Sequence, residues 1–132
     1  MNSYVKQLIK LVLKYAFRVE VHGLANYTEK HEGTLIISNH LSLLDGIFLH
    51  FFLPGDSVFL VNRLTAEIWY FRPFLVFVRL LKVDDGKPIA LKTAVSVLEK
   101  GDKIIVFPEG RVSTLGIPMK IYPGTAFIAD KA

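Results

Sequence analysis

A histidine and an aspartate five residues apart, His40 and Asp45, are the residues of this sequence best suited to acid-base chemistry. An aspartate that accepts a hydrogen bond from one imidazole nitrogen fixes the tautomer and leaves the other nitrogen free to take a proton from a hydroxyl. On an ideal helix the two side chains would lie about 140° apart, so they face each other only if His40 precedes the helix. The alternative is a loop histidine beside an aspartate that only caps a helix.

A second group of candidate residues, Glu109, Gly110 and Arg111, follows a proline in a turn. The guanidinium suits bidentate recognition of a phosphate. Glu109 suits either a hydrogen bond from a substrate hydroxyl or an ion pair with that arginine, and the alternative is an ordinary surface turn with a salt bridge. Lys120 would add charge to an anion site, and Arg63 is either a further substrate contact or an exposed loop arginine.

Three short apolar runs must position these side chains: Thr34–Ile37, Val58–Val61 and Lys103–Phe107. They are typical of buried strands, and the polar residues follow their carboxyl ends, where open α/β sheets bind ligands. A helix expected over Pro88–Lys100 and ended by Gly101 has the length of a crossover, which favours parallel pairing. We therefore expect an α/β fold, a mostly parallel central sheet flanked by helices.

The helices and strands around this sheet can be assigned from capping and alternation. Ser42 is expected as the N-cap, with Asp45 completing a capping-box-like pattern, of a helix that continues over 46–53. The alternation of Val19–Gly23 predicts a further short strand. Gly124 is expected to open a helix at Thr125.

The N-terminal segment is basic and amphipathic, because Lys6, Lys10, Lys14 and Arg18 recur every four positions among apolar residues. We expect a helix over 1–18 that lies on an anionic membrane surface, the alternative being a helix that covers the core with a solvated basic face. From 67 to 81, aromatic and arginine side chains interleave with aliphatic ones, as favoured at a membrane interface, and Pro73 argues against one spanning helix.

The composition sets limits on function. The chain has 132 residues, enough for one domain, and 52% hydrophobic against 21% charged residues, which argues against disorder. A net charge of +4 suits a membrane surface, a phosphate-bearing substrate or nucleic acid, but no nucleic-acid recognition motif is present. The absence of cysteine excludes disulfides, a thiolate nucleophile and cysteine-based zinc sites. His22 and His31 have no partner at metal-ligand spacing, so we expect no metal.

Two motifs resemble those of a known family. Residues 39–45, Asn-His-Leu-Ser-Leu-Leu-Asp, resemble the N-H-x-x-x-x-D block of the glycerophospholipid acyltransferases, and Phe107–Gly110 resembles their second signature. The blocks occur in the expected order and separation, and the similarity includes residues 21–23 and 120–124. Within the family, 107–114 and 119–124 look most like the acyltransferase portion of the bifunctional bacterial 2-acylglycerophosphoethanolamine acyltransferase/acyl-carrier-protein synthetase.

The resemblance implies a glycerol-3-phosphate acyltransferase-like fold, with His40 as general base and Asp45 as its orienting partner. Glu109, Gly110 and Arg111 would bind the glycerophosphate moiety. The candidate substrate contacts, from the resemblance and the residue types together, are Glu109, Gly110, Arg111, Asn39, Ser42, Arg63 and Lys120.

The implied reaction is transfer of an acyl group from an acyl carrier protein or coenzyme A thioester to the free hydroxyl of a lysophospholipid, such as lysophosphatidylethanolamine or lysophosphatidic acid. Direct transfer is expected, since the chain has neither a Gly-x-Ser-x-Gly elbow nor a cysteine. Backbone N–H groups after Ser42 would stabilise the oxyanion, and no cofactor is required. Such an enzyme would associate with membrane lipids, at the cytoplasmic face of the bacterial inner membrane.

The sequence departs from the family pattern in two places. The commoner pattern has its arginine two residues after the glycine, whereas Arg111 follows Gly110 directly. Family members continue into a further strand with a Val-Pro-type signature, so we expect a single acyltransferase domain over 1–132 that is truncated at its C-terminal end. The competing hypothesis is a non-catalytic membrane lipid-binding module, which would explain the charge but not His40, Asp45 and Glu109 at strand ends.

Overall fold

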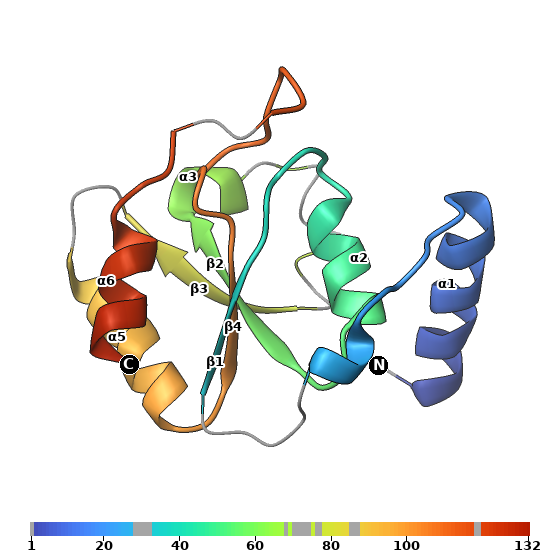
Figure 1. Cartoon of the computed structure of the whole chain (residues 1–132), viewed down its shortest axis with the longest axis horizontal. Coiled ribbons are helices and arrows are strands. Elements are labelled where there is room, and N and C mark those ends of the chain that lie inside the picture. Colours follow the sequence, from blue (N-terminus) through green and yellow to red (C-terminus); the bar gives the residue numbers. More distant parts are fainter. Residues whose placement is uncertain are drawn as a thin grey trace.

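A parallel four-stranded sheet in the order β1-β4-β2-β3 forms the centre of the part of the chain that the structure describes (Figure 1). The structure is a computed structural model and describes residues 2–27, 33–67, 69, 75, 78–84, 88–117 and 120–132. The strands are β1 (Thr34–Ile37), β2 (Ser57–Asn62), β3 (Arg79–Val83) and β4 (Lys103–Val106). The helices are α1 (Ser3–Ala16), the 3-10 turn η1 (Leu24–Asn26), α2 (Asp45–Phe52), α3 (Arg63–Ala66), α5 (Pro88–Glu99) and α6 (Gly124–Lys131).

The expected α/β architecture is confirmed, including the parallel pairing that the crossover helix α5 predicted. Helices α5 and α6 cover one face of the sheet, and α2 lies on the other with α1 outside it (Figure 1). The core on the α5 side is an apolar cluster in which Ala94 and Leu98 of α5 meet residues of β2, β4 and α6. Its buried members are Val58, Ala94, Leu98, Ile104, Val106 and Ile128.

The register of the sheet brings the two motifs together. Ile37 pairs with Val106 at the carboxyl ends of β1 and β4, and the main-chain N–H of Ser38 donates to the carbonyl of Val106 at 3.1 Å. The segments after these strands therefore leave the same edge of the sheet side by side. This places residues near 40 beside residues near 109.

One predicted strand does not form, and one observed strand was not predicted. Val19–Gly23 is not a strand in the structure, since the chain instead turns at Gly23 (φ 70°) into η1. Conversely, β3 begins within the last residues of the run 67–81, which was interpreted as an interface segment, and continues to Val83; its alternation is obscured by neighbouring apolar residues. Arg79 at its start forms a bidentate ion pair with Asp102, with both N–O distances 3.0 Å.

The rest of the aromatic run lies largely outside the described residues, Pro73 included. Trp69 is described and is 78% exposed. His31 also falls outside the described residues, whereas His22 is an exposed residue that pairs with Glu20 at 3.1 Å.

Helix α1 forms as expected but contributes no buried residue to the core. It packs against α2. The ring of Phe17, directly after α1, meets that of Phe48 edge to face with centroids 5.4 Å apart, and Lys10 Nζ lies 5.4 Å from the Phe52 ring centroid. Apolar side chains remain exposed on its outer side: Tyr4, Val5, Leu8, Leu11, Val12 and Tyr15. No helix of the described residues is both long enough and apolar enough to cross a bilayer.

Candidate active site

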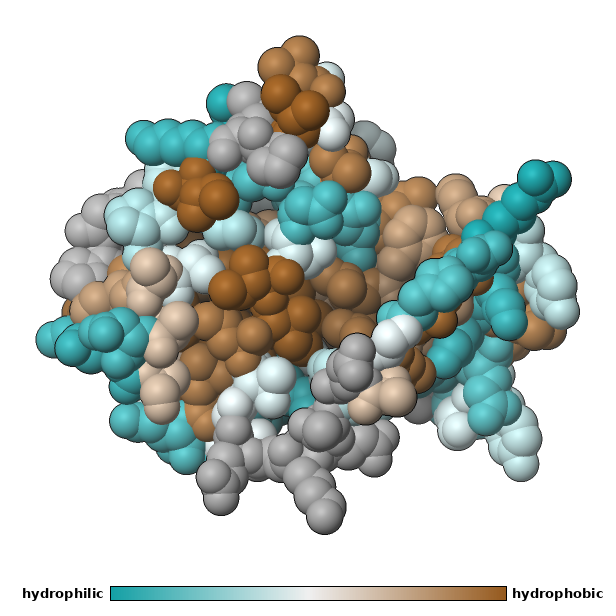
Figure 2. All heavy atoms as spheres, viewed as in Figure 1, coloured by the Kyte–Doolittle hydropathy of each residue, from teal (hydrophilic) through white to brown (hydrophobic). Residues whose placement is uncertain are grey.

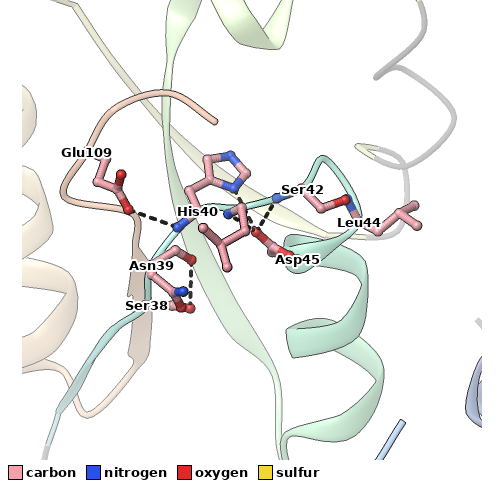
Figure 3. A network of polar contacts seen from close by, with 8 residues as sticks. Ser38, Asn39, His40, Ser42, Leu44, Asp45 and Glu109 are labelled. Carbon is pink, nitrogen blue, oxygen red and sulfur yellow. Dashed lines mark hydrogen bonds and ion pairs between the residues drawn. The ribbon is translucent and has the colours of Figure 1, made fainter. Parts of the chain in front are cut away.

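The turn between β1 and α2 holds His40 against Asp45. Oδ2 of Asp45 accepts hydrogen bonds from His40 Nδ1 at 3.1 Å, from the Leu41 N–H at 2.7 Å and from the Ser42 N–H at 2.8 Å (Figure 3). Because α2 begins at Asp45, His40 precedes the helix, as the facing side chains required. The second imidazole nitrogen points away from Asp45, so the proton-accepting atom of a neutral ring would be Nε2.

Ser42 is not the N-cap of α2, which corrects the sequence expectation. The N-cap is Leu44 and has no side-chain cap. The Asp45 carboxylate instead binds His40 and the turn before the helix, and the helix begins only at Asp45. Ser42 Oγ accepts a hydrogen bond from the Leu44 N–H at 3.1 Å. The Asp45 N–H donates to the Ser42 carbonyl at 3.2 Å. Two of the N–H groups after Ser42 that were expected as oxyanion donors, those of residues 44 and 45, therefore already donate within the turn, as do those of residues 41 and 42.

The loop after β4 holds the main chain of His40 from the opposite side. Glu109, whose exposure is 3%, accepts the His40 N–H through Oε1 at 3.1 Å. The buried Ser113 donates its main-chain N–H to the His40 carbonyl at 2.6 Å. The sequence did not single out Ser113 as a contact of His40. Its position four residues after Glu109 was the feature that could have indicated it. Glu109 was expected to meet a substrate hydroxyl or Arg111, and its contact with the His40 main chain was not predicted.

A small apolar cavity of about 90 Å³ lies beside the imidazole. The ring stacks on Phe107, with centroids 4.1 Å apart and planes inclined by 19°. The other walls come from the β1–α2 turn, from β2 and β3, and from Gly110, and include Leu43, Phe59, Val61 and Leu80. Apolar walls beside a histidine that is held by a carboxylate suit a reaction on a group attached to a hydrocarbon chain.

A second, larger cavity of about 460 Å³ lies at the same sheet edge on the α5 and α6 side. It shares Leu60, Asn62, Phe107 and Gly110 with the first, and Tyr122 is among its other walls. Gly110 separates the two with a left-handed backbone (φ 65°), and a Cβ there would lie 3.3 Å from the Tyr122 ring. A side chain at this position would crowd Tyr122 and the boundary between the cavities.

The remaining candidate residues do not surround His40. Arg63 Nε pairs with Asp84 at 2.8 Å, beyond the ends of β2 and β3. Arg111 is exposed, and so is Lys120, whose Nζ lies 5.1 Å from the Tyr122 ring centroid. Asn39 is exposed, and its carbonyl accepts from Ser38 Oγ at 3.0 Å. The structure therefore brings together His40, Asp45, Ser42, Glu109 and Gly110, and leaves the cations at the surface.

Comparison with known proteins gives consistent matches. Residues 18–132 match the model of the acyltransferase family. The chain is 26% identical over 138 residues to the human 1-acyl-sn-glycerol-3-phosphate acyltransferase alpha, which covers 99% of this chain and 48% of that protein. It is 31% identical over 104 residues to the 1-acyl-sn-glycerol-3-phosphate acyltransferase of Helicobacter pylori, covering 74% of this chain and 43% of that protein.

A solved structure is also similar. The crystal structure of the 1-acyl-sn-glycerophosphate acyltransferase PlsC from Thermotoga maritima superposes with a TM-score of 0.69 at 26% identity, covering 97% of this chain and 53% of that one. The chain thus spans about half the length of the relatives it matches. With the family model matched over residues 18–132 and the same fold in a solved relative, the chain belongs to the acyltransferase family.

Proposed function

We propose that this protein transfers an acyl group from a thioester to the free hydroxyl of a lysophospholipid. The observation that carries the proposal is the His40 imidazole, held at Nδ1 by Asp45 and lining an apolar cavity. The similar proteins named above are acyltransferases of 1-acyl-sn-glycerol 3-phosphate. Their names support the same class of acceptor here.

In this mechanism His40 is the general base. Nε2 takes the proton of the acceptor hydroxyl as that oxygen attacks the thioester carbonyl. The tetrahedral intermediate collapses with cleavage of the carbon–sulfur bond, and the imidazolium passes its proton to the leaving thiolate. Asp45 stabilises the imidazolium through Nδ1–H, as the third member of a triad whose nucleophile is the substrate.

The finer acceptor identity is a choice between two lysophospholipids. The relatives favour lysophosphatidic acid, whereas the sequence pattern after Phe107 favours lysophosphatidylethanolamine. Arg111 and Lys120 are exposed near Gly110 along the chain and are the cations that we propose to meet the glycerophosphate. Coenzyme A and acyl carrier protein remain the two candidate thioester donors.

We further propose that α1 lies on the membrane surface. Its lysines and its exposed apolar side chains occupy different sides of one helix, the arrangement of interfacial helices. The alternative in which α1 covers the core receives little support, because no residue of α1 is buried. The proposed location is the cytoplasmic face of a bacterial inner membrane, where both thioester donors are available.

The test is transfer of a labelled acyl group from either thioester to a panel of lysophospholipids. We expect His40→Ala to abolish transfer and His22→Ala to leave it unchanged, since His22 is an exposed histidine that pairs only with Glu20 among the described residues. Circular dichroism would establish that both variants fold. Transfer that persists in a folded His40→Ala protein would refute the mechanism.

The second candidate function is a lipid-binding module without catalysis, favoured by the exposed apolar side of α1. It predicts that lipid binding is abolished when Lys6, Lys10 and Lys14 are neutralised, and that His40→Ala has no effect on lipid binding. The transfer assay, run together with a measurement of lipid binding on the same variants, therefore separates the two functions.

A further inference from the structure

We propose that the tip of the loop after Glu109, formed by Leu115, Gly116 and Ile117 and called the loop tip below, inserts into the bilayer that holds the lipid acceptor. It would thereby orient the His40 cavity toward the membrane. The inference rests on the proposed function, in which the acceptor is a membrane lipid. It concerns a surface separate from α1.

The loop tip projects beyond the carboxyl edge of the sheet with its apolar side chains exposed. Leu115 is 71% and Ile117 59% exposed. Figure 1 shows this loop as the part that extends furthest from the strand ends, and Figure 2 shows hydrophobic residues at its apex. Gly116 turns the chain with φ 70° and has open space around it. Two large aliphatic side chains on a projecting turn suit insertion into an apolar phase.

Hydrogen bonds connect the loop tip to the catalytic histidine through one residue. Ser113 Oγ donates to the Ile117 carbonyl at 2.7 Å, which closes the base of the turn. The main-chain N–H of the same serine donates to the His40 carbonyl at 2.6 Å. A membrane contact at the tip would therefore hold the reacting imidazole at a fixed place relative to the bilayer surface.

Charge and apolarity around the tip fit a bilayer better than a protein partner. Arg111 and Lys120 are exposed on the two sides of the loop, before and after the tip. Apolar exposure continues beyond Lys120, where Ile121 is 64% and Tyr122 51% exposed. An apolar tip that is flanked along the chain by cations, with an exposed aromatic residue after the second of them, has the kinds of side chain that suit the hydrocarbon, the interface and the anionic headgroups of a leaflet.

The absence of cysteine from this chain allows a direct test. Leu115→Cys and, separately, Ile117→Cys would be labelled with an environment-sensitive fluorophore and mixed with vesicles of phosphatidylcholine and phosphatidylglycerol in equal parts. Thr93→Cys, on the exposed side of α5, is the control label. We expect vesicles to shift the emission of both tip labels to the blue, with quenching by bromolipids, and to leave the Thr93 label unchanged.

Three results would overturn the inference. One is bound protein whose tip labels keep their aqueous emission. Another is a tip label that is already shielded without vesicles, which would mean that other protein covers the tip. The third is failure of the chain to bind these vesicles at all. None of these readouts requires acyl transfer, so they test the tip separately from the proposed function.

Activity gives a second test with a charge control. We expect Leu115→Asp with Ile117→Asp to lower transfer to acceptors in vesicles by roughly tenfold or more, because burial of a large aliphatic side chain is lost. Transfer to a short-chain acceptor dissolved as monomers should be unchanged. Thr114→Asp adds charge beside the tip without removing an apolar group and should have a smaller effect. Equal losses on dissolved and vesicle acceptors would assign the tip a role in the site itself.

Discussion

The main-chain N–H of His40 donates a hydrogen bond of 3.1 Å to Oε1 of Glu109, which lies 69 residues later in the chain. The carbonyl of His40 accepts from Ser113 of the same loop. The histidine is therefore fixed at its side chain by Asp45 and at its main chain by the loop after β4. This relationship brings two distant motifs into one arrangement, and it makes the loop a determinant of where Nε2 lies.

Asp45→Asn should reduce turnover strongly while keeping the turn. The amide oxygen can still accept from the Leu41 and Ser42 N–H groups, but the neutral side chain cannot stabilise an imidazolium. We expect a fall of roughly two orders of magnitude or more in the rate of transfer, measured by release of thiol from the thioester. Asp130→Asn, at an exposed aspartate of α6, is the control and should be as active as the parent protein.

Glu109→Ala should destabilise the fold more than Glu109→Gln. The alanine leaves the His40 N–H without its acceptor in a largely buried place, which costs about 1–3 kcal/mol, whereas glutamine retains an acceptor oxygen. Urea unfolding would measure both. The exposed Glu99→Ala provides the background effect of losing a glutamate. Equal destabilisation by alanine and glutamine would show that the negative charge, and not the accepted hydrogen bond, matters.

Gly110→Ala should be more damaging than Gly116→Ala, although both glycines have left-handed backbones (φ 65° and 70°). A left-handed backbone costs each alanine about 1–2 kcal/mol of folding free energy. At Gly110 the new Cβ also lies 3.3 Å from the Tyr122 ring, whereas at Gly116 it meets no atom within 4 Å. Thermal unfolding of the two variants measures the difference. A larger loss at Gly116 would contradict the packing of Tyr122 against the loop.

Stability should fall with acidification because of His50. Burial and the nearby positive charge of Lys6 lower the pKa of this histidine in the folded protein below its ordinary 6.5. Below about pH 6.5 the unfolded chain therefore binds more protons at this site than the folded one, and folding stability decreases as the pH falls toward the folded pKa. At pH values above the unfolded pKa, His50 costs no folding stability, because its side chain is neutral in both the folded and the unfolded protein.

The measurement is the free energy of urea unfolding at about pH 7.5 and about pH 5.5. We expect His50→Phe to reduce the difference between the two values, because phenylalanine takes up no proton. The replacement breaks no hydrogen bond at the buried Nε2 of His50, which has no partner in the described part of the chain. His22→Phe, at an exposed histidine, is the control for the substitution itself. An unchanged pH dependence in His50→Phe would contradict the lowered pKa.

The local elements of this protein could be predicted from its residues alone. Apolar runs predicted β1, β2 and β4, and the spacing of Leu91, Ala94, Val95 and Leu98 agrees with the buried face of α5. The contact between His40 and Asp45 was also predictable, because a five-residue turn limits the possible arrangements to a few. In all of these cases the deciding interactions lie within one element or one turn.

The contacts between distant residues depend on how the sheet assembles, and they could not be predicted from local patterns. The register of β1 against β4 places Glu109 and Ser113 on the His40 main chain, and no local pattern encodes that register. The edge strand β3 was missed because pairing with β2, not its own alternation, makes it a strand. Arg63 turned to Asp84 because β2 and β3 end side by side. Long-range pairing is a property of the folded sheet, so the anchoring of the His40 main chain arises only when the sheet is assembled.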